Sequence, residues 1–171
     1  GKVKRKKTVQ GYADESAWAR GQSWALYGYT MMYRCTNDPA YLEQAKKIAE
    51  FLTNHPNLPK DKIPYWDFNA PVTKTTYRDV SASSIMASAL LELGQFVDES
   101  DRNKYVGIAT KILQSLSKKA YRAKPGENGG FILKHSVGSL PHKSEVDVPL
   151  TYADYYFIEA LLRYQKWYLD K

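Results

Sequence analysis

Hydrophobic and polar positions follow two different helical patterns along the chain. Segments 17–34, 80–97 and 150–168 carry apolar or small residues on nearly every side, which is typical of helices that are buried all round. Segments 39–53 and 101–119 carry apolar residues at i, i+3, i+4 and i+7, with Lys, Glu and Gln opposite. This second pattern predicts amphipathic helices with one face in water.

Polar residues and prolines mark where these helices start and stop. Ser16 is placed to cap the first helix, Asp38 precedes Pro39 at the start of the second, and His55-Pro56 ends it. Short polar side chains stabilise a helix N-terminus, and proline fits the first helical position. The chain therefore alternates buried and amphipathic helices, an order that predicts an all-α, αα-hairpin toroid with an inner and an outer ring.

Two long connections, 55–79 and 120–149, each lead into a helix predicted to be buried, as does the lead-in at 1–15. Connections of this length in a compact domain usually have a function, and the apolar runs in the second predict a short hairpin. The three inner helices therefore start at the same end of the arc. Because helix N-termini favour anions, we expect a binding site for a carboxylate or sulfate there.

The amino-acid composition indicates the class of protein but does not identify its function. The 171 residues suit one domain, and 43% hydrophobic residues indicate a folded protein. Cys35 is the only cysteine, so no internal disulfide forms. The sequence does not decide between the bacterial cytoplasm and the periplasm as the location of the protein. The chain starts at Gly1 without a signal-like apolar segment, so we expect that an upstream portion was removed.

The formal net charge of +7 includes a basic run at residues 2–7. Such a run is usually a solvated end, and the chain has no nucleic-acid-binding motif, so nucleic acid is not an expected partner. No apolar run is long enough for a membrane span, so no membrane association is expected. The three histidines and one cysteine show no metal-ligand spacing, and we expect no metal and no cofactor.

The stretch from Gln10 to Trp24 carries the strongest chemical signal, because Arg20, Gln22 and Trp24 stand where a polar turn enters a buried helix. It closely resembles the unsaturated glucuronyl hydrolases, family 88 of the glycoside hydrolases. The resemblance is carried by four motifs in order: 10–24, 65–68, 78–83 and 146–163. It implies a six-hairpin (α/α)6 barrel, of which residues 1–171 would be the C-terminal portion of a single domain whose N-terminal half is missing.

The resemblance also implies a reaction. These enzymes remove an unsaturated uronic acid from lyase-generated oligosaccharides of the glycosaminoglycan type. An Asp protonates C4 of the C4=C5 double bond and activates a water for C5, and the resulting hemiketal rearranges to release the aglycone. The family's Asp pair is expected upstream of residue 1, so no catalytic residue is assigned in this chain, and the chain alone is expected to be inactive.

Three positions match the family's substrate-binding motifs. Gln10 would hydrogen-bond the sugar, Arg20 would pair with its anionic group through a planar guanidinium, and Trp24 would stack on a ring. Val9 stands where the family commonly has His, so a histidine contact at that place is not expected. The expected partner is thus an unsaturated uronate oligosaccharide.

Structural roles compete with these assignments. Arg20 is also a candidate ion-pair partner for Asp14 or Asp79, and Trp24 is a candidate core residue. For the acidic residues near the predicted site, helix capping or ion pairing is a better interpretation than catalysis. These residues are Asp14, Asp67, Asp79, Asp147 and Asp154. His135 and His142 belong to a loop that could contact a sulfate or the aglycone, but we expect this loop to be solvent-exposed surface.

Two other functions remain open from sequence. One is a non-catalytic carbohydrate-binding or interaction module. The other is an unsaturated rhamnogalacturonyl hydrolase, although those enzymes typically have Asn-Gly-Trp where this chain has Gln22-Ser-Trp24. An open arc of helices would also leave apolar faces uncovered. We therefore expect the chain to self-associate or to pack against a missing N-terminal half.

Overall fold

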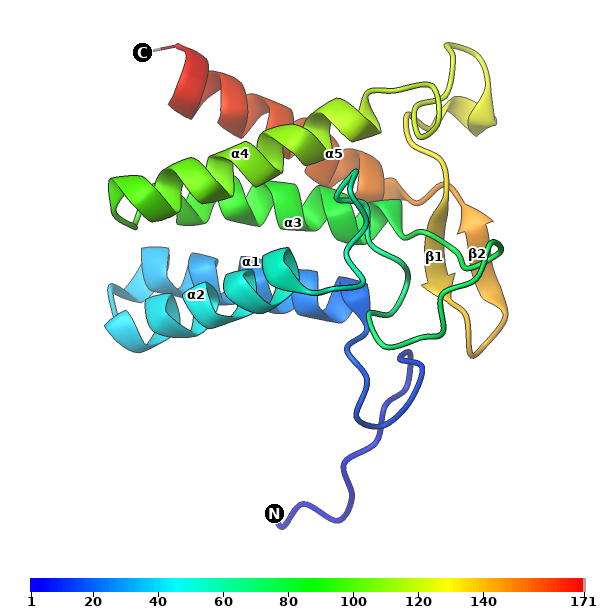
Figure 1. Cartoon of the computed structure of the whole chain (residues 1–171), viewed down its shortest axis with the longest axis horizontal. Coiled ribbons are helices and arrows are strands. Elements are labelled where there is room, and N and C mark those ends of the chain that lie inside the picture. Colours follow the sequence, from blue (N-terminus) through cyan, green and yellow to red (C-terminus); the bar gives the residue numbers. More distant parts are fainter. Residues whose placement is uncertain (171) are drawn as a thin grey trace.

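The computed structural model describes residues 1–170, which form five α-helices and one antiparallel hairpin (Figure 1). The described elements are α1 Ala19–Thr36, α2 Pro39–Asn54, α3 Val80–Leu93, α4 Glu99–Leu116, a 3-10 turn Asn128–Gly130, β1 Ser136–Ser139, β2 Ser144–Val148, α5 Thr151–Tyr164 and a π-helical turn Gln165–Leu169. The all-α prediction is confirmed, since the hairpin is the only strand pair among these residues.

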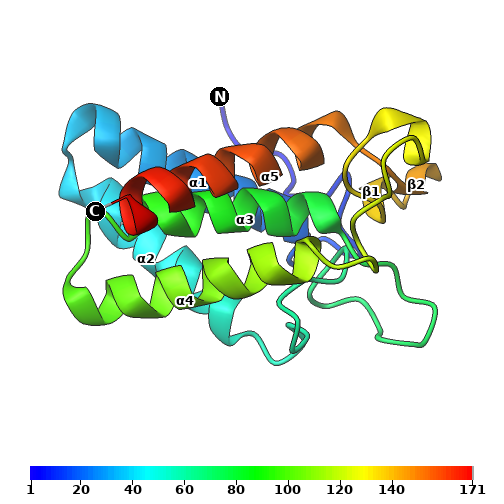
Figure 2. The same ribbon diagram turned by 90° about the horizontal axis from the view of Figure 1, so that it is seen from above.

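The helices form an arc of αα-hairpins. α3 lies between α1 and α5, while α2 packs on α1 and α4 packs on α3 (Figures 1 and 2). The inner row is therefore α1, α3 and α5, and the outer row is α2 and α4, as the alternation of helical patterns predicts. The main hydrophobic core lies between the two rows and is built largely from Leu, Ile and Ala side chains.

Burial differs sharply within the inner row. All 14 residues of α3 are buried, because this helix has neighbours on both sides and a row of small residues that admits them. The prediction that the first and fifth helices are buried all round is wrong for this chain, because each has an inner-row neighbour on one side only. α1 exposes Tyr29 and Met31, and α5 exposes its apolar residues Tyr155, Ile158, Leu161 and Leu162. The expected uncovered faces are thus present.

The start of α1 also differs from the prediction. The helix begins at Ala19, with Trp18 at the N-cap and no capping side chain. Ser16 does not cap it, because its hydroxyl donates to Asp67 Oδ2 at 2.7 Å. Residues 17–18 are instead held in an extended conformation by bonds to segment 66–69, including Ala19 N to Trp66 O at 3.0 Å. A tertiary contact therefore overrides the local capping signal.

The other helix starts follow local chemistry. The carboxylates of Asp38, Asp79 and Asp98 accept backbone N–H groups in the first turns of α2, α3 and α4. α3 ends at Leu93 and α5 at Tyr164, each earlier than the sequence pattern predicts, and the π-helical turn follows α5 directly.

Both long connections lie at the end of the arc where α1, α3 and α5 begin, on the right in Figure 1. The hairpin predicted in the second connection is confirmed, with Ser139 opposite Ser144 and an irregularity beside Ser136. No helix within residues 1–170 has the length and hydropathy needed to cross a bilayer. The fold therefore brings the lead-in, both connections and three helix N-termini to one end.

Candidate functional site

Arg20 is the centre of this end of the molecule. It lies in the first turn of α1 and is only 4% exposed. Its Nη1 donates to Asp79 Oδ2 at 2.9 Å, to Ser81 Oγ at 3.3 Å and to the carbonyl oxygen of Val137. Its Nη2 donates to the carbonyl oxygen of Gly138. One guanidinium thus joins the starts of α1 and α3 to strand β1.

Asp79 is the charged partner of Arg20 and is completely buried. Its Oδ1 accepts the Ser81 hydroxyl at 2.6 Å and the Ser81 N–H at 3.1 Å, so the carboxylate also caps α3. Burial raises the pKa of Asp79 above its ordinary value, while the Arg20 guanidinium and these hydrogen bonds act against that rise. Of the two ion-pair partners considered from sequence, Asp79 is the one the structure pairs with Arg20.

Gln10 is brought to the same guanidinium by the lead-in. Its Oε1 accepts from Arg20 Nη2 at 3.2 Å. The lead-in is held in place by Asp67, which is buried and accepts the Tyr12 N–H at 2.9 Å in addition to the Ser16 hydroxyl. Because the amide oxygen of Gln10 faces Arg20, its NH₂ group is the end that remains to donate to a ligand.

Aromatic rings surround the guanidinium and continue along α1. The Arg20 guanidinium carbon lies 4.6 Å from the Trp18 ring centroid and 5.4 Å from that of Tyr152. Trp24 follows Arg20 by one helical turn, and its ring meets the edge of Tyr156 at 5.0 Å between centroids. The three predicted binding residues therefore lie at or near the start of α1, with Gln10 bonded to Arg20 and Trp24 one turn away.

Sequence and structure comparisons identify the relatives of this chain. No family model matches it. It is 50% identical over 165 residues to an unsaturated glucuronyl hydrolase of Formosa agariphila, covering 96% of this chain and 40% of that protein. It is 38% identical to an unsaturated glucuronyl hydrolase of Bacillus sp. strain GL1, covering 93% and 42%. A crystal structure of an unsaturated glucuronyl hydrolase specific for heparin superposes with a TM-score of 0.94 at 54% identity, covering 97% of this chain and 44% of the other.

The chain matches unsaturated glucuronyl hydrolases over nearly its whole length, in agreement with the resemblance of its sequence motifs. Its helical arc is accordingly part of an (α/α)6 barrel, and the predicted fold is confirmed. The chain spans about 40% of the length of the curated relatives that it matches. A second solved member, from Bacillus sp. GL1, superposes with a TM-score of 0.85 at 33% identity, covering 94% of this chain and 42% of the other.

In this chain, a polar network that the sequence pattern did not predict continues along the inner row. The Tyr27 hydroxyl donates to Glu159 Oε1 at 3.1 Å, and the Ser88 hydroxyl donates to Glu159 Oε2. Arg163 lies 3.5 Å from the same carboxylate and donates to Ser88 O at 2.9 Å. Tyr27 and Tyr156 meet edge to face at 5.2 Å, so the network supports the ring that contacts Trp24.

The network ends at a buried glutamate. Glu92, only 2% exposed, pairs with Arg163 at 2.9 Å and with Arg34 at 2.6 Å. The nearby Glu92 carboxylate raises the pKa of Arg34 above its ordinary value. A charged residue inside an apolar helix needs a partner, so Arg34, Glu92, Glu159 and Arg163 were detectable from the sequence as candidates for such pairing.

The remaining acidic residues near the site hold loops. Asp14 accepts the Thr8 N–H and pairs with Arg5 at 3.5 Å on the surface. Asp147 contacts His135 Nδ1 at 2.7 Å. Asp154 accepts the N–H groups of residues 132 and 133. Together with Asp67 and Asp79, these carboxylates are engaged in local structure, in agreement with the roles that the sequence favours for them.

His142 contacts Ser139 Oγ through Nδ1 at 2.7 Å, so this contact lies within the hairpin loop. Among the described residues, no group of three or more His, Cys, Asp or Glu side chains is placed to hold a metal ion. The residues that converge at this end can donate hydrogen bonds, offer positive charge and stack on a ring.

Proposed function

We propose that this chain is the C-terminal portion of a single (α/α)6-barrel domain and forms one wall of its substrate site. The complete protein would remove an unsaturated uronic acid from lyase-generated glycosaminoglycan oligosaccharides by hydrating the C4=C5 double bond. The observation that carries the proposal is the Gln10–Arg20–Asp79 constellation in a chain 50% identical to an unsaturated glucuronyl hydrolase.

The three predicted residues have distinct roles in this proposal. Arg20 supplies positive charge and fixes the Gln10 amide, whose NH₂ group donates to the sugar acid. Trp24, supported by Tyr156, offers a ring for stacking. Both terminal nitrogens of Arg20, Nη1 and Nη2, donate to protein acceptors, which include Asp79, Gln10 and the carbonyls of Val137 and Gly138. Arg20 therefore acts mainly by positioning its neighbours and through its charge.

The catalytic Asp pair is proposed to lie outside these residues. The five aspartates discussed above each have a structural partner, which leaves none of them as an evident general acid. The exposed apolar faces of α1 and α5 would then be covered by the other helices of the same domain, since large uncovered apolar surfaces are rare in monomeric proteins.

We further propose that the substrate is of the heparin type. The support is the 54% identity to a solved enzyme specific for heparin. A solved Streptococcus agalactiae member bound to dGlcA-GalNAc6S is 33% identical. Each of these relatives is an unsaturated glucuronyl hydrolase, so a rhamnogalacturonyl substrate is the weaker choice.

The test is ultraviolet absorbance of an unsaturated heparin disaccharide mixed with the 171-residue chain, alongside a direct binding titration. The conjugated alkene absorbs, and its hydration removes the signal. The proposal predicts saturable binding without loss of absorbance, with binding weakened in Arg20→Lys and Trp24→Ala. A non-catalytic module gives the same result for the chain alone, so the two are separated by restoring the rest of the domain, which should produce turnover only under our proposal.

A further inference from the structure

The net positive charge of this chain resides in its loops. The lead-in 1–18 and the connections 55–79 and 117–150 together contain fifteen Lys and Arg against eight Asp and Glu, whereas the rest of the sequence has ten of each. The whole net charge of +7 therefore belongs to segments that lie at, or lead into, the Arg20 end of the arc. A charge of one sign gathered on one face attracts ligands of the opposite sign.

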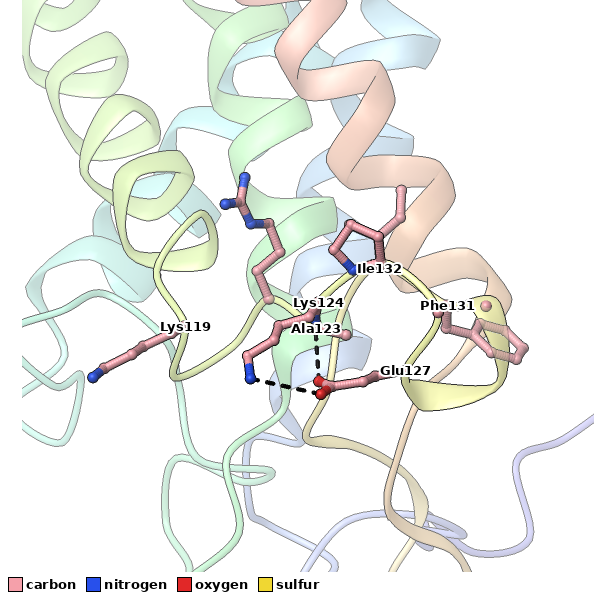
Figure 3. Close-up of a pocket in the computed structure, with 10 residues that line it drawn as sticks. Lys119, Ala123, Lys124, Glu127, Phe131 and Ile132 are labelled. Carbon is pink, nitrogen blue, oxygen red and sulfur yellow. Dashed lines mark hydrogen bonds and ion pairs between the residues drawn. The ribbon is translucent and has the colours of Figure 1, made fainter.

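A cleft of about 450 Å³ lies in the second of these connections (Figure 3), within the roughly 300–1,000 Å³ range of ligand sites. Lys119, Arg122 and Lys124 line it, and Glu127 is the one acidic residue of its lining. Glu127 is already engaged by Lys124, whose Nζ lies 3.8 Å from Oε1. Figure 3 shows these two side chains facing each other, with Lys119 and Phe131 at opposite ends of the view.

The apolar part of the lining gives the cleft a surface suited to a sugar ring. It includes Ala123, Pro125, Phe131 and Ile132, and the last two are half-buried. Cationic side chains beside an apolar surface suit a ligand that carries anionic substituents on a ring with an apolar face.

The backbone around the cleft is fixed. Ala123 N donates to Ile132 O at 2.9 Å, and the backbones of Arg122 and Leu133 form an isolated antiparallel β-bridge. The Ile132 and Leu133 N–H groups are bonded to Asp154 of α5 at 2.7 and 2.9 Å. The cleft is therefore anchored to the same helix that carries Tyr152 and Tyr156 of the Arg20 site.

We propose that this cleft binds a sulfated or carboxylated sugar of a glycosaminoglycan chain whose unsaturated end lies at Arg20. Naming this ligand class rests on the proposed function. Ile132 and Gly138 are six residues apart, and six extended residues span at most about 20 Å. The cleft is thus within reach of an oligosaccharide longer than a disaccharide, and its occupancy raises affinity for longer chains.

The test compares two double variants with the same loss of charge, Lys119→Glu with Arg122→Glu in the cleft and Lys104→Glu with Lys111→Glu on the exposed side of α4. Binding of a heparin octasaccharide and of an unsaturated heparin disaccharide is measured at one ionic strength, and far-UV circular dichroism checks the fold. We expect the cleft variant to bind the octasaccharide at least about tenfold more weakly, because one hydrogen bond to a charged group contributes on the order of tenfold. The α4 variant is expected to change much less, and neither variant to change disaccharide binding.

Equal losses in the two variants would overturn the proposal, because net charge alone would then explain binding. Competition by a DNA duplex as effective as that by the octasaccharide would also overturn it, since the surface would then recognise polyanions in general. If the disaccharide fails to bind while octasaccharide binding still depends on Lys119 and Arg122, the proposed function is wrong and the proposed binding site in the cleft is supported.

Discussion

Replacing Asp79 with Asn is the most informative perturbation of the site. Asn keeps an oxygen that can cap α3 and accept from Ser81, but it places an NH₂ group against Arg20 where a carboxylate oxygen lies at 2.9 Å. The guanidinium, which is 4% exposed, is then buried without a counter-charge. The neutral acceptors at Gln10, Val137 and Gly138 remain.

The expected loss follows from this burial. Removing one partner of a buried ion pair costs about 3–5 kcal/mol, a large share of the roughly 5–15 kcal/mol that stabilises a typical domain. With a urea m-value of about 2 kcal/mol/M, a loss of 3 kcal/mol lowers the unfolding midpoint by about 1.5 M. The exposed Lys46–Glu43 pair at 3.7 Å supplies the control, because Glu43→Gln should cost only about 0–1 kcal/mol.

The assay is urea unfolding of the 171-residue chain, followed by tryptophan fluorescence and by far-UV circular dichroism. Coincident transitions establish two-state behaviour. A double-mutant cycle then adds Arg20→Met, and we expect the double variant to be more stable than the sum of the single effects by about 1–3 kcal/mol. An Asp79→Asn loss below about 1 kcal/mol, or an additive cycle, would refute the claim that this pair holds the site together.

Three further predictions concern pH and association. Burial raises the pKa of Tyr27 and of Tyr105 to about 12. Tyrosine in the unfolded chain ionises near pH 10, so the free energy of unfolding should fall as the pH rises from 10 toward 12. The fall should be smaller in Tyr27→Phe. A free energy of unfolding that does not change over this pH range would contradict the prediction. Burial lowers the pKa of His55, so stability should fall as pH drops below about 6.5, an effect that urea titrations should find absent in His55→Gln. Light scattering should detect self-association of the isolated chain through the exposed face of α5, reduced by Ile158→Lys with Leu162→Lys; a monomeric wild-type chain opposes it.

Much of the fold was predictable because helical periodicity records local burial. The five helices, their order and the cap at Asp38 follow from residues close in sequence. Ser16 shows the limit of this reasoning, because Asp67, 51 residues away, takes the hydroxyl that local chemistry assigns to a cap. The sequence pattern overstated the burial of α1 and α5, because a pattern of burial does not say which chain supplies the covering side chains.

The arrangement of the candidate site was predictable in part, while its role in substrate binding stays a prediction. Gln10, Arg20 and Trp24 share one short stretch, and the structure brings two of them into contact. The carbonyl of Gly138 at the same guanidinium lies 118 residues from Arg20, and no local pattern indicates that meeting. The charged residues within the inner helices did carry a signal, since buried charges require partners, but their pairing depends on the three-dimensional arc.

We propose that this chain supplies the substrate-binding wall of an unsaturated glucuronyl hydrolase. The most direct measurement replaces the matching portion of the heparin-specific relative, 54% identical, with residues 1–171 and follows the alkene absorbance of an unsaturated heparin disaccharide. Our account predicts that the chimera removes the absorbance at an enzymatic rate and that Arg20→Met abolishes this activity. A folded chimera that leaves the absorbance unchanged, while the parent enzyme removes it, would contradict the account.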